Sequence, residues 1–553
     1  MPAMSWLIPL GLYALALVLR LLVANELPFP TAEPSAYYVD VARNLVAGEG
    51  LVSSGVWSYS TPPLEVPKPA FELWLPMSSL VSAAAMTLLG SSFWAAQVGS
   101  AVLGAAVAPL AWAVGREAAN AQGLDSRRGR AVAITAGLLA AVLSPLVLGS
   151  VVPDSYTPFT VFVLAAGLLI PRVTGARNGH DDVMPPSIVA GLGLGLLMGL
   201  AYLSRQEVIW LGLTVLIMQG WVLNWRPTGA RLREATHRLW PVFVGGLVVV
   251  VPWLTRNYLE LGSPFPGQAV ENLFLVENED IFAFRHHPDA ATYLAQGAGV
   301  VLMNPLRAAW DNLLNVILFP AFPVGVAGLI ALVGMRRSRA LRRPTALVAL
   351  LLSGLFIFVS VMVLFPVATL WGTFMHSAGP LLVALGVVAA LGGDDLLARI
   401  SAWRAWERPN VIIAPIALVS MAVLFSLLQV RLLSTQSHDT QTRYAALAAA
   451  VDQVAQAEGT TPPETLISDH PLWLAEATGG YAVALPDEEV DAVAELGGVF
   501  GTDWIVIVDE RGRYPEALLD PAAAGCLTAA PVALEGTEAG AWLFRLKEAC
   551  PSA

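Results

Sequence analysis

Charged residues are scarce in this chain. Only 13% of its 553 residues are Asp, Glu, Lys or Arg, whereas 56% are hydrophobic and the mean hydropathy is +0.64. Soluble globular proteins carry about 25% charged residues, so there is too little polar surface to keep this apolar mass in water. Long apolar runs, such as residues 188–203 and 345–365, approach the ~20 residues that span a bilayer. The sequence therefore excludes a soluble protein and predicts a polytopic α-helical membrane protein.

Several motifs of soluble enzymes are also missing. There is no P-loop, no G-x-G-x-x-G after a strand, no C-x-x-C and no H-E-x-x-H, so soluble nucleotide-sugar chemistry has no recognisable site. A strongly basic composition is absent, and we expect no nucleic-acid partner. The two cysteines, Cys526 and Cys550, both lie near the C-terminus. A disulfide between them and a pair of free thiols are both compatible with the sequence.

The acidic charge is concentrated at one end of the chain. The formal net charge is −11, but residues 431–553 hold 19 acidic and 6 basic residues, a net charge of −13, whereas residues 1–430 are close to neutral. This division predicts two domains, a transmembrane domain over residues 1–430 and a water-facing domain over residues 431–553, called the tail below.

Hydropathy predicts about eleven transmembrane helices. They cover residues 7–24, 93–115, 131–151, 156–170, 188–202, 208–223, 239–254, 313–335, 345–365, 375–391 and 411–430. The first helix lacks a basic flank and a good cleavage site, so we expect a retained signal anchor. No internal repeat is visible, which weighs against transporters built from two similar halves.

The basic residues orient these helices in the membrane. Eighteen of the 31 basic residues fall in five short loops that alternate on one face, and the positive-inside rule makes that face cytoplasmic. The outer loops 25–92 and 256–312, with interfacial helices, then lie outside with the tail, while the N-terminus is cytoplasmic. Residues 70–89 are predicted to form a helix in the outer interface, because a twelfth span there would place the arginine-rich loop 116–130 outside.

The tail is predicted to be a small α/β domain. Strand-like runs at residues 465–467, 504–508 and 541–546 alternate with helical patterns at residues 439–458 and 488–496. Within it, the adjacent residues Asp469 and His470 are interpreted as structural, because neighbouring residues at the end of a strand point to opposite faces.

Ionisable residues at the outer ends of the predicted helices are the candidate functional residues, because a charge near lipid is costly and is rarely kept without a role. This face carries carboxylates and a few cations. Cations there can hold a lipid phosphate, and a carboxylate can activate an incoming hydroxyl as a general base or bind a divalent metal ion. The face therefore favours chemistry on a phosphate-linked lipid.

Two carboxylates are candidates for the catalytic role. Glu33 precedes Pro34 at the predicted start of a helix that ends at Gly48, where the helix dipole favours a negative charge. Asp154 emerges from the third predicted helix on the same face. Each residue can equally be interpreted as a helix cap, and both interpretations stay open.

Three basic residues and one histidine are candidate phosphate ligands. Lys68 stands between two prolines that stiffen its backbone. Arg205 and Arg256 each follow a transmembrane helix and could form bidentate phosphate contacts. His376 is predicted to open an outer helix, whose N-terminus favours anions. The alternatives are a lysine whose charge reaches the headgroup level, two arginine anchors and a structural histidine.

Taken together, these segments resemble the GT-C superfamily of integral-membrane glycosyltransferases, in particular the branch of protein O-mannosyltransferases and aminoarabinose transferases. The resemblance covers nearly the whole transmembrane part, and the tail segment 467–480 looks like the outer domains of bacterial members. Two departures are that Glu33 stands where the family usually has Asp, and that Pro67 replaces a common Glu. The matching positions are Glu33, Tyr37, Tyr38, Ala42 to Leu45, Gly48, Gly50, Lys68, Pro69, Trp74, Leu75, Asp154, Arg256, Asn257, Gly262 and Pro264.

The resemblance implies that the protein transfers a hexose or pentose from a polyprenyl-phosphate donor to a glycan, lipid or protein acceptor, with inversion, at the outer face of the plasma membrane of a bacterium. It implies Glu33 and Asp154 as catalytic residues and leaves a divalent metal ion on them open. The implied substrate ligands are Lys68, Arg205, Arg256, His376 and Tyr37. Two other functions stay open, a transporter or flippase for a lipid-linked saccharide and a membrane scaffold that has lost catalysis.

Overall fold

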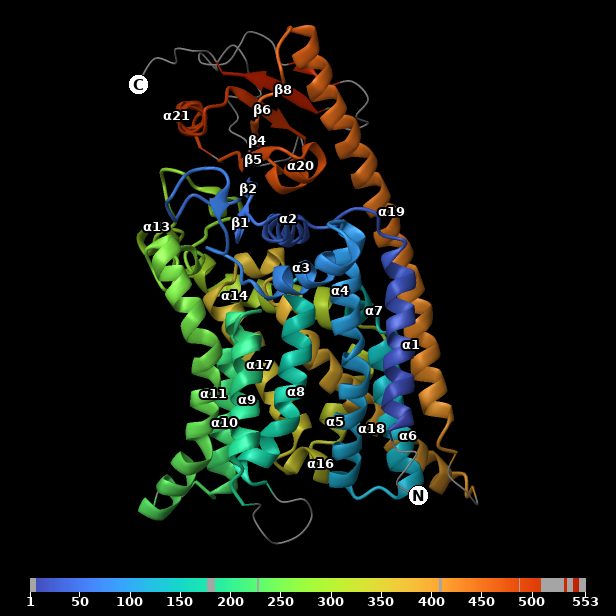
Figure 1. The fold of residues 1–553 in the computed structure, drawn as a ribbon. Coiled ribbons are helices and arrows are strands. Elements are labelled where there is room, and N and C mark those ends of the chain that lie inside the picture. The colour runs from blue at the N-terminus through green and yellow to red at the C-terminus, as the bar shows by residue number, and fades with distance from the viewer. Residues whose placement is uncertain are drawn as a thin grey trace.

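The computed structural model describes residues 6–176, 185–225, 228–406, 410–486, 488–508, 532–534 and 541–546. These residues form a tall bundle of helices with a small α/β unit at one end (Figure 1). Helix α1 (Leu7–Ala24) begins at the opposite end of the bundle. The predicted fold class, a polytopic helical membrane protein with a small C-terminal α/β unit, is confirmed. Cys526 and Cys550 lie outside the described residues.

Seven helical stretches of the described chain are long and apolar enough to cross a membrane. They are α1, the kinked pair α4 (Phe93–Ala105) and α5 (Val107–Gln122), α8 (Tyr156–Thr174), α11 (Gly229–Leu261), α17 (Ala346–Leu364), α18 (Gly379–Trp403) and α19 (Ile413–Ala457). Four further helices belong to the bundle, namely α6 (Ser126–Val142), α9 (Ile188–Tyr202), α10 (Ile209–Val222) and α15 (Val324–Gly334). Each of the eleven predicted transmembrane helices overlaps one of these stretches.

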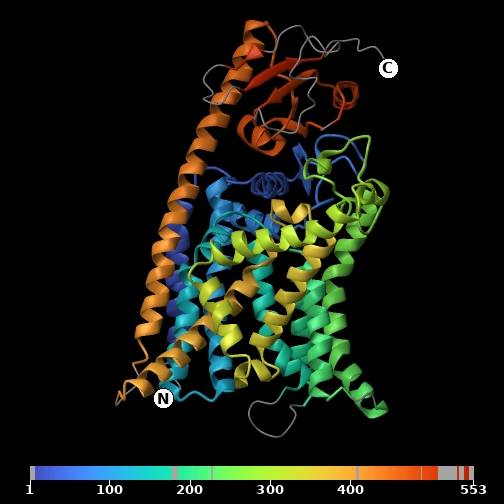
Figure 2. The same cartoon turned by 180° about the vertical axis from the view of Figure 1, so that it is seen from behind.

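Interfacial helices lie at the end of the bundle that faces the tail. Helix α2 (Glu33–Ala47) and helix α3 (Met77–Leu89) lie there together (Figure 1). The 13 residues of α3 extend about 20 Å, too short for a hydrocarbon core of about 30 Å. Helix α14 (Ala298–Asn312) crosses the same end of the bundle, as Figure 2 shows from behind. The helix predicted over residues 70–89 begins only at Met77 in the structure, and its place at the membrane interface stays a prediction.

Short elements complete the outer and inner connections. They are α7 (Ser144–Leu148), η2 (Gln206–Val208), α12 (Gln268–Glu271), η3 (Glu279–Phe282), α13 (Ala290–Ala295), the π-helical η4 (Leu313–Leu318), α16 (Arg339–Arg342), η5 (Ala368–Trp371), η6 (Met375–Ser377) and the hairpin-like pair β1 (Val52–Ser53) with β3 (Lys68–Pro69). The arginine-rich α16 lies at the end of the bundle opposite to the tail (Figure 1).

The α/β unit is built on a six-stranded sheet in the order β2-β5-β4-β6-β8-β7. Its strands are β4 (Thr465–Ser468), β5 (Tyr481–Ala484), β6 (Trp504–Ile507), β7 (Val532–Ala533), β8 (Trp542–Arg545) and β2 (Gly55–Val56), and its helices are α20 (Pro471–Thr478) and α21 (Val490–Phe500). The strands predicted at β4, β6 and β8 and the helix predicted at α21 are confirmed. One edge strand, β2, comes from the first outer loop and pairs in parallel with β5.

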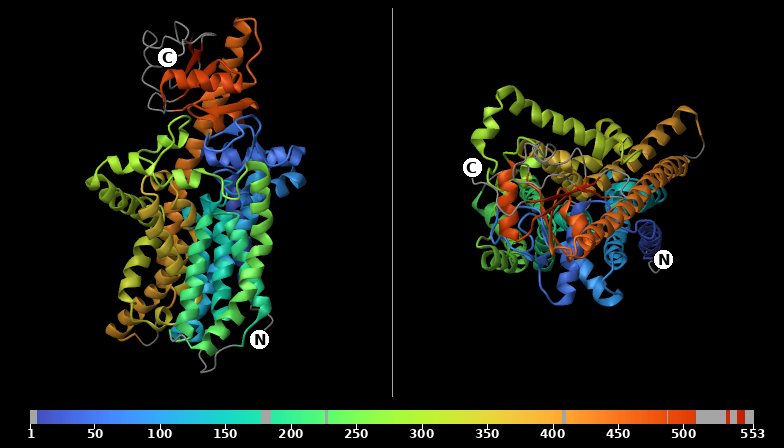
Figure 3. Two further views of the ribbon diagram at one scale, coloured as in Figure 1. Left: turned by 90° about the vertical axis from the view of Figure 1, so that its left-hand side faces the viewer. Right: turned by 90° about the horizontal axis from the view of Figure 1, so that it is seen from above.

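Helix α19 joins the bundle to the tail without a break. Its 45 residues extend about 68 Å, and Figure 3 shows it rising from the bundle into the α/β unit. Residue 430, the predicted end of the transmembrane domain, falls inside this helix. The tail is therefore attached twice, by a continuous helix and by the strand β2 that the first outer loop contributes.

Helices α9 and α11 are in backbone contact. Glycines recur every four residues on α9, at Gly191, Gly195 and Gly199, a pattern of small residues that permits close helix approach in membranes. A Cβ added to Gly195 would lie only 2.0 Å from the carbonyl oxygen of Val242 on α11. Only glycine fits at this crossing.

We expect Gly195→Ala to lower the free energy of unfolding by about 1–3 kcal/mol, the usual cost of overpacking, because the new methyl group pushes α11 away. Gly193→Ala on the same helix is the matched control, since its Cβ would lie 3.5 Å from Leu169. Both variants gain the same helix propensity. The difference between their melting temperatures in detergent therefore reports the clash between residue 195 and the backbone of Val242. Equal stability of the two variants would contradict the close approach of α9 and α11 at Gly195.

Candidate active site

A cavity of about 370 Å³ lies between the end of the bundle that faces the tail and the loops 25–92 and 256–312, which are called the outer loops after their predicted side. One part of its wall is apolar and comes from α10 and α17, with residues Ile209, Trp210, Val361, Leu364 and Phe365. The rest of the wall is more polar and includes Tyr38, Arg205, Glu207, Asn272, Asn278 and His376. The cavity therefore joins a surface suited to an alkyl chain with one suited to a polar or charged group.

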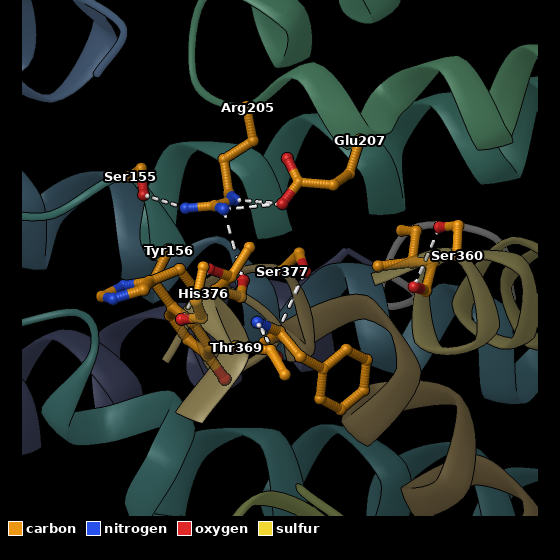
Figure 4. A network of polar contacts seen from close by, with 12 residues as sticks. Ser155, Tyr156, Arg205, Glu207, Ser360, Thr369, His376 and Ser377 are labelled. Atoms are coloured by element: carbon orange, nitrogen blue, oxygen red, sulfur yellow. Dashed lines mark hydrogen bonds and ion pairs between the residues drawn. The ribbon is translucent and has the colours of Figure 1, made fainter. Parts of the chain in front are cut away.

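Arg205 is the centre of a hydrogen-bond network at the polar wall. Its guanidinium donates to Oε1 of Glu207 at 2.6 and 3.0 Å, to Oγ of Ser155 at 3.2 Å and to the carbonyl oxygen of Thr373 at 3.2 Å. Figure 4 shows the guanidinium between Ser155 and Glu207. The contacts join the start of α8, the α9–η2 turn and the η5–η6 turn, so three distant segments hold one cation at the cavity.

Asp154 joins this network from behind the cavity wall. Its carboxylate lies 2.9 Å from Nδ1 of His376 and accepts a hydrogen bond of 2.8 Å from Oγ of Ser155. Burial alone would raise the pKa of Asp154, but His376, Ser155 and Arg205 outweigh burial and lower the pKa to about 2. The carboxylate is therefore held ionised, next to a histidine that lines the cavity.

Glu33 opens helix α2, as predicted, but its carboxylate is turned toward the tail. Its side chain is buried, Oε1 lies 2.9 Å from Nδ1 of His470, and Oε2 accepts a hydrogen bond of 3.2 Å from the backbone N–H of Leu472. The next residue, Pro34, lines the large cavity. Glu33 thus precedes a cavity-lining residue in sequence, while its carboxylate contacts residues more than 430 positions away.

Lys68 and Tyr37 lie together beside a second, much smaller cavity. Nζ of Lys68 donates to the carbonyl oxygen of Ser58 at 2.8 Å and to both carboxylate oxygens of Glu72 at 2.8 and 2.9 Å. Burial lowers the pKa of Lys68 and raises the pKa of Glu72. Burial thus opposes the charged form of both side chains, and each one favours the charged form of its partner. The hydroxyl of Tyr37 accepts a hydrogen bond of 2.7 Å from the N–H of Phe71.

Arg256 contacts backbone of the first outer loop. It donates to the carbonyl oxygens of Ala70 at 2.7 Å and Leu51 at 3.2 Å. Of the four predicted phosphate ligands, Arg205 and His376 line the large cavity, whereas Lys68 and Arg256 hold the first outer loop in place. A sequence cannot distinguish these two uses, since both require a cation at the outer end of a helix.

The residues present do not form a metal site by themselves. Within the described ranges, no group of three or more His, Cys, Asp or Glu side chains is close enough to hold a metal ion. Glu33 and Asp154, the predicted metal ligands, are each paired with a separate histidine. We therefore derive no step through a metal ion.

The contacts between the outer loops and the tail were not predicted. His470 was interpreted as structural, yet it contacts Glu33, while Asp469 accepts from the N–H of Val508 on the other side. Alternation along the strand end correctly indicates opposite directions but cannot reveal the partners. Arg43 forms a bidentate ion pair with Glu476, with both distances at 2.7 Å. No local sequence pattern marks either pair.

No protein-family model and no curated protein sequence matches this chain. Several solved structures, in contrast, match it. Over the full length of both chains, it is similar to ArnT from Cupriavidus metallidurans in the apo state, with a TM-score of 0.55 and 15% identity, and to the same protein bound to undecaprenyl phosphate, with a TM-score of 0.51 and 15% identity. It is also similar to the Archaeoglobus fulgidus oligosaccharyltransferase complexed with Zn and sulfate, with a TM-score of 0.53 and 12% identity over 89% of this chain and 67% of that one.

These likenesses define the fold class. The chain shares its fold with ArnT and with the Archaeoglobus fulgidus oligosaccharyltransferase, and the predicted resemblance is confirmed at the level of the fold. More particularly, its full-length similarity to ArnT includes the outer domain that follows the last membrane helix. An integral membrane protein follows from the fold and from the apolar helices.

The Asp154–His376 pair can be tested by a double-mutant cycle. We expect His376→Ala to destabilise the protein more than His376→Ala combined with Asp154→Asn, because the single variant leaves a buried carboxylate with one partner fewer. The coupling energy should be about 1–3 kcal/mol, measured by unfolding in bicelles. Additive effects of the two substitutions would show that the residues do not interact.

The same pair predicts a pH dependence. The folded pKa of Asp154, about 2, lies below the ordinary value of 3.8, so its stabilising contribution is complete above about pH 4 and is lost as the pH falls toward 2. The melting temperature of the wild type should therefore fall more steeply over this range than that of Asp154→Asn. Parallel curves would contradict the assignment.

Proposed function

We propose that this protein transfers a sugar from a polyprenyl-phosphate donor to an acceptor hydroxyl at the extracytoplasmic face of the membrane. The observation that carries the proposal is the amphipathic cavity, where an apolar wall formed by α10 and α17 meets the cation Arg205 and His376. Such a cavity fits a lipid chain joined to a phosphate. The extracytoplasmic location of the cavity is inferred from the arginine-rich connections at the other end of the bundle.

The donor would lie with its prenyl chain along Ile209, Trp210 and Leu364 and with its phosphate at Arg205 and His376. Arginine is suited to this role because its planar fork can contact two phosphate oxygens. The phosphate would take over part of the interaction that Glu207 now makes with Arg205. The ArnT structure with undecaprenyl phosphate supports a ligand of this class.

The cavity also offers a position for the sugar. Asn272 lines it, and the Oδ1 atom of this residue is buried and has no hydrogen-bond partner among the described residues. A buried acceptor without a donor costs about 1–3 kcal/mol, so this atom is stabilised by a ligand that brings a hydrogen-bond donor. A sugar hydroxyl is such a donor.

The reaction proposed is a single displacement. The acceptor oxygen attacks the anomeric carbon, the bond from this carbon to the phosphate oxygen breaks, and polyprenyl phosphate leaves with the electron pair. Glu33 takes the proton of the acceptor hydroxyl as general base, and the ionised Asp154 orients the site through His376. One displacement inverts the configuration of the anomeric carbon. Lys68, Arg256 and Tyr37 support the site by holding the first outer loop.

The test uses the full-length protein in nanodiscs with a panel of sugars on undecaprenyl phosphate and a radiolabel in the sugar. We expect release of undecaprenyl phosphate together with a labelled product. Movement of the labelled donor across a vesicle membrane without release of undecaprenyl phosphate would instead show a transporter. If neither occurs with any donor of the panel, the proposal is wrong.

Glu33→Gln should reduce kcat by about 10²–10⁴-fold, the usual contribution of a general base, because the amide cannot accept the proton. The steady-state rate of undecaprenyl phosphate release measures this change. Glu65→Gln replaces an exposed carboxylate of the same loop, whereas Glu33 is buried; this variant is the control and should keep wild-type activity. A Glu33→Gln variant with most of its activity would exclude Glu33 as the base.

Arg205→Lys should raise KM for the donor by about 10–100-fold, since a lysine keeps the charge but cannot make bidentate contacts. Arg256→Lys is the matched comparison. Because Arg256 contacts backbone carbonyls and not the cavity, we expect it to lower the melting temperature with a smaller change in KM. Equal effects of the two variants on KM would contradict the distinction between them.

A further inference from the structure

The tail supplies two contacts to the carboxylate of Glu33. Nδ1 of His470 lies 2.9 Å from Oε1, and the N–H of Leu472 donates to Oε2 at 3.2 Å. We propose that the tail completes the active site and that His470 is a positioning residue, which sets the direction of the general base. This inference rests on the proposed function of Glu33 and extends it to the tail.

The segment around His470 is itself fixed on both sides. Its ring packs on Trp473, with ring centroids 5.3 Å apart, and Nε1 of Trp473 donates to the carbonyl oxygen of Pro30 at 3.0 Å. Pro30 lies three residues before Glu33, so the same turn of α20 holds both the carboxylate and the backbone that leads to it. Pro471 at the start of α20 restricts the backbone between the two contacts.

Orientation of this carboxylate has a direct consequence for catalysis. A misplacement of about 1 Å in a reacting group can reduce the rate by about 100-fold. Glu33 lies at the start of α2, beside Pro34 in the cavity wall, and its long side chain has several rotamers. The two contacts with the tail select one of them. His470 therefore acts through Glu33 and does not need to touch the substrate.

Docking of the tail does not depend on His470. Independent contacts hold the tail on the outer loops, among them the Arg43–Glu476 ion pair, the pairing of β2 with β5, and the ion pairs of Arg285 with Asp491 and Glu495. Replacement of His470 should therefore leave the tail in place and change only the carboxylate that it contacts. This separation makes the positioning role testable.

The substitutions at His470 are chosen according to the ring nitrogen that contacts Glu33. Nδ1 of histidine and Nδ2 of asparagine are both bonded to Cγ, so His470→Asn can place an N–H near Oε1 of Glu33. In His470→Gln the amide nitrogen is one bond further out, near the position of Nε2. His470→Ala removes the contact altogether. The three variants thus differ in the one interaction under test.

The experiment compares these variants in the full-length protein with the assay for undecaprenyl phosphate release. We expect kcat to fall by about 100-fold in His470→Ala and His470→Gln, to recover to within about tenfold of wild type in His470→Asn, and KM for the donor to stay nearly constant. Glu476→Gln, which weakens tail docking without touching Glu33, should keep kcat. A merely structural His470 would give the same loss in all three variants, or a matching loss in Glu476→Gln, and either result would overturn the proposal.

A second measurement is independent of catalysis. Labelling of Glu33 by a water-soluble carbodiimide, followed by mass spectrometry, reports how firmly the carboxylate is held. The labelling rate should rise in His470→Ala and His470→Gln but not in His470→Asn. If the wild type has no transferase activity and this pattern still appears, the proposed function is wrong while the positioning of Glu33 by the tail is upheld. Equal labelling in the wild type and all three variants would show that His470 does not position Glu33.

Discussion

The end of this molecule that carries the tail depends on the pairing of ionisable side chains that are largely buried. A charged side chain next to the apolar bundle loses its hydration, and removal of its partner would leave an uncompensated charge that costs several kcal/mol. Here the partners come from distant parts of the chain: Glu33 with His470, Asp154 with His376, and Arg43 with Glu476. Each pair fixes the relative position of two segments that no covalent connection holds together. The Asp154–His376 pair lies at the wall of the candidate site.

The position of the tail is likewise fixed by contacts between distant segments. Helix α19 brings the tail above the bundle, but a single helix leaves its rotation and tilt free. The strand β2 and the charged pairs between the loops and the tail remove this freedom. The first outer loop is in turn held by Lys68, Glu72 and Arg256, whose hydrogen bonds end on backbone or on one another. The result is one connected rim of loops and tail, in which the loops supply residues to the cavity wall.

The cavity combines two environments that an amphiphilic ligand would need. Bundle helices supply an apolar wall, whereas the turns between them supply Arg205 and His376. This division is a consequence of membrane topology, because helix interiors must be apolar and connections can be charged. The similarity to ArnT shows that other proteins use the same fold, and the particular contacts of Glu33 show how this chain builds its own version of the rim.

Much of the architecture could be predicted from the sequence because hydropathy and charge act locally. Runs of apolar residues predict the bundle helices, the distribution of basic loops favours an interfacial helix over residues 70–89, and short strand-like runs predict β4, β6 and β8. Glu33, Asp154, Arg205 and His376 stand out as candidates because ionisable residues at helix ends are few, and of these Arg205 and His376 line the large cavity. Lys68 and Arg256 satisfied the same criterion, yet they hold a loop, since residue type and position along a helix do not state which atoms a cation will meet.

The sequence by itself therefore determined the class of protein, the order of its helices and the set of charged residues that could act at the outer rim. Only the tertiary structure decided the partners, because each pair joins residues separated by up to 437 positions and arises from the packing of whole segments. A carboxylate followed by a proline marks the start of a helix. That this carboxylate meets the imidazole of His470 depends on how α19 and β2 dock the tail, and no local pattern carries that information.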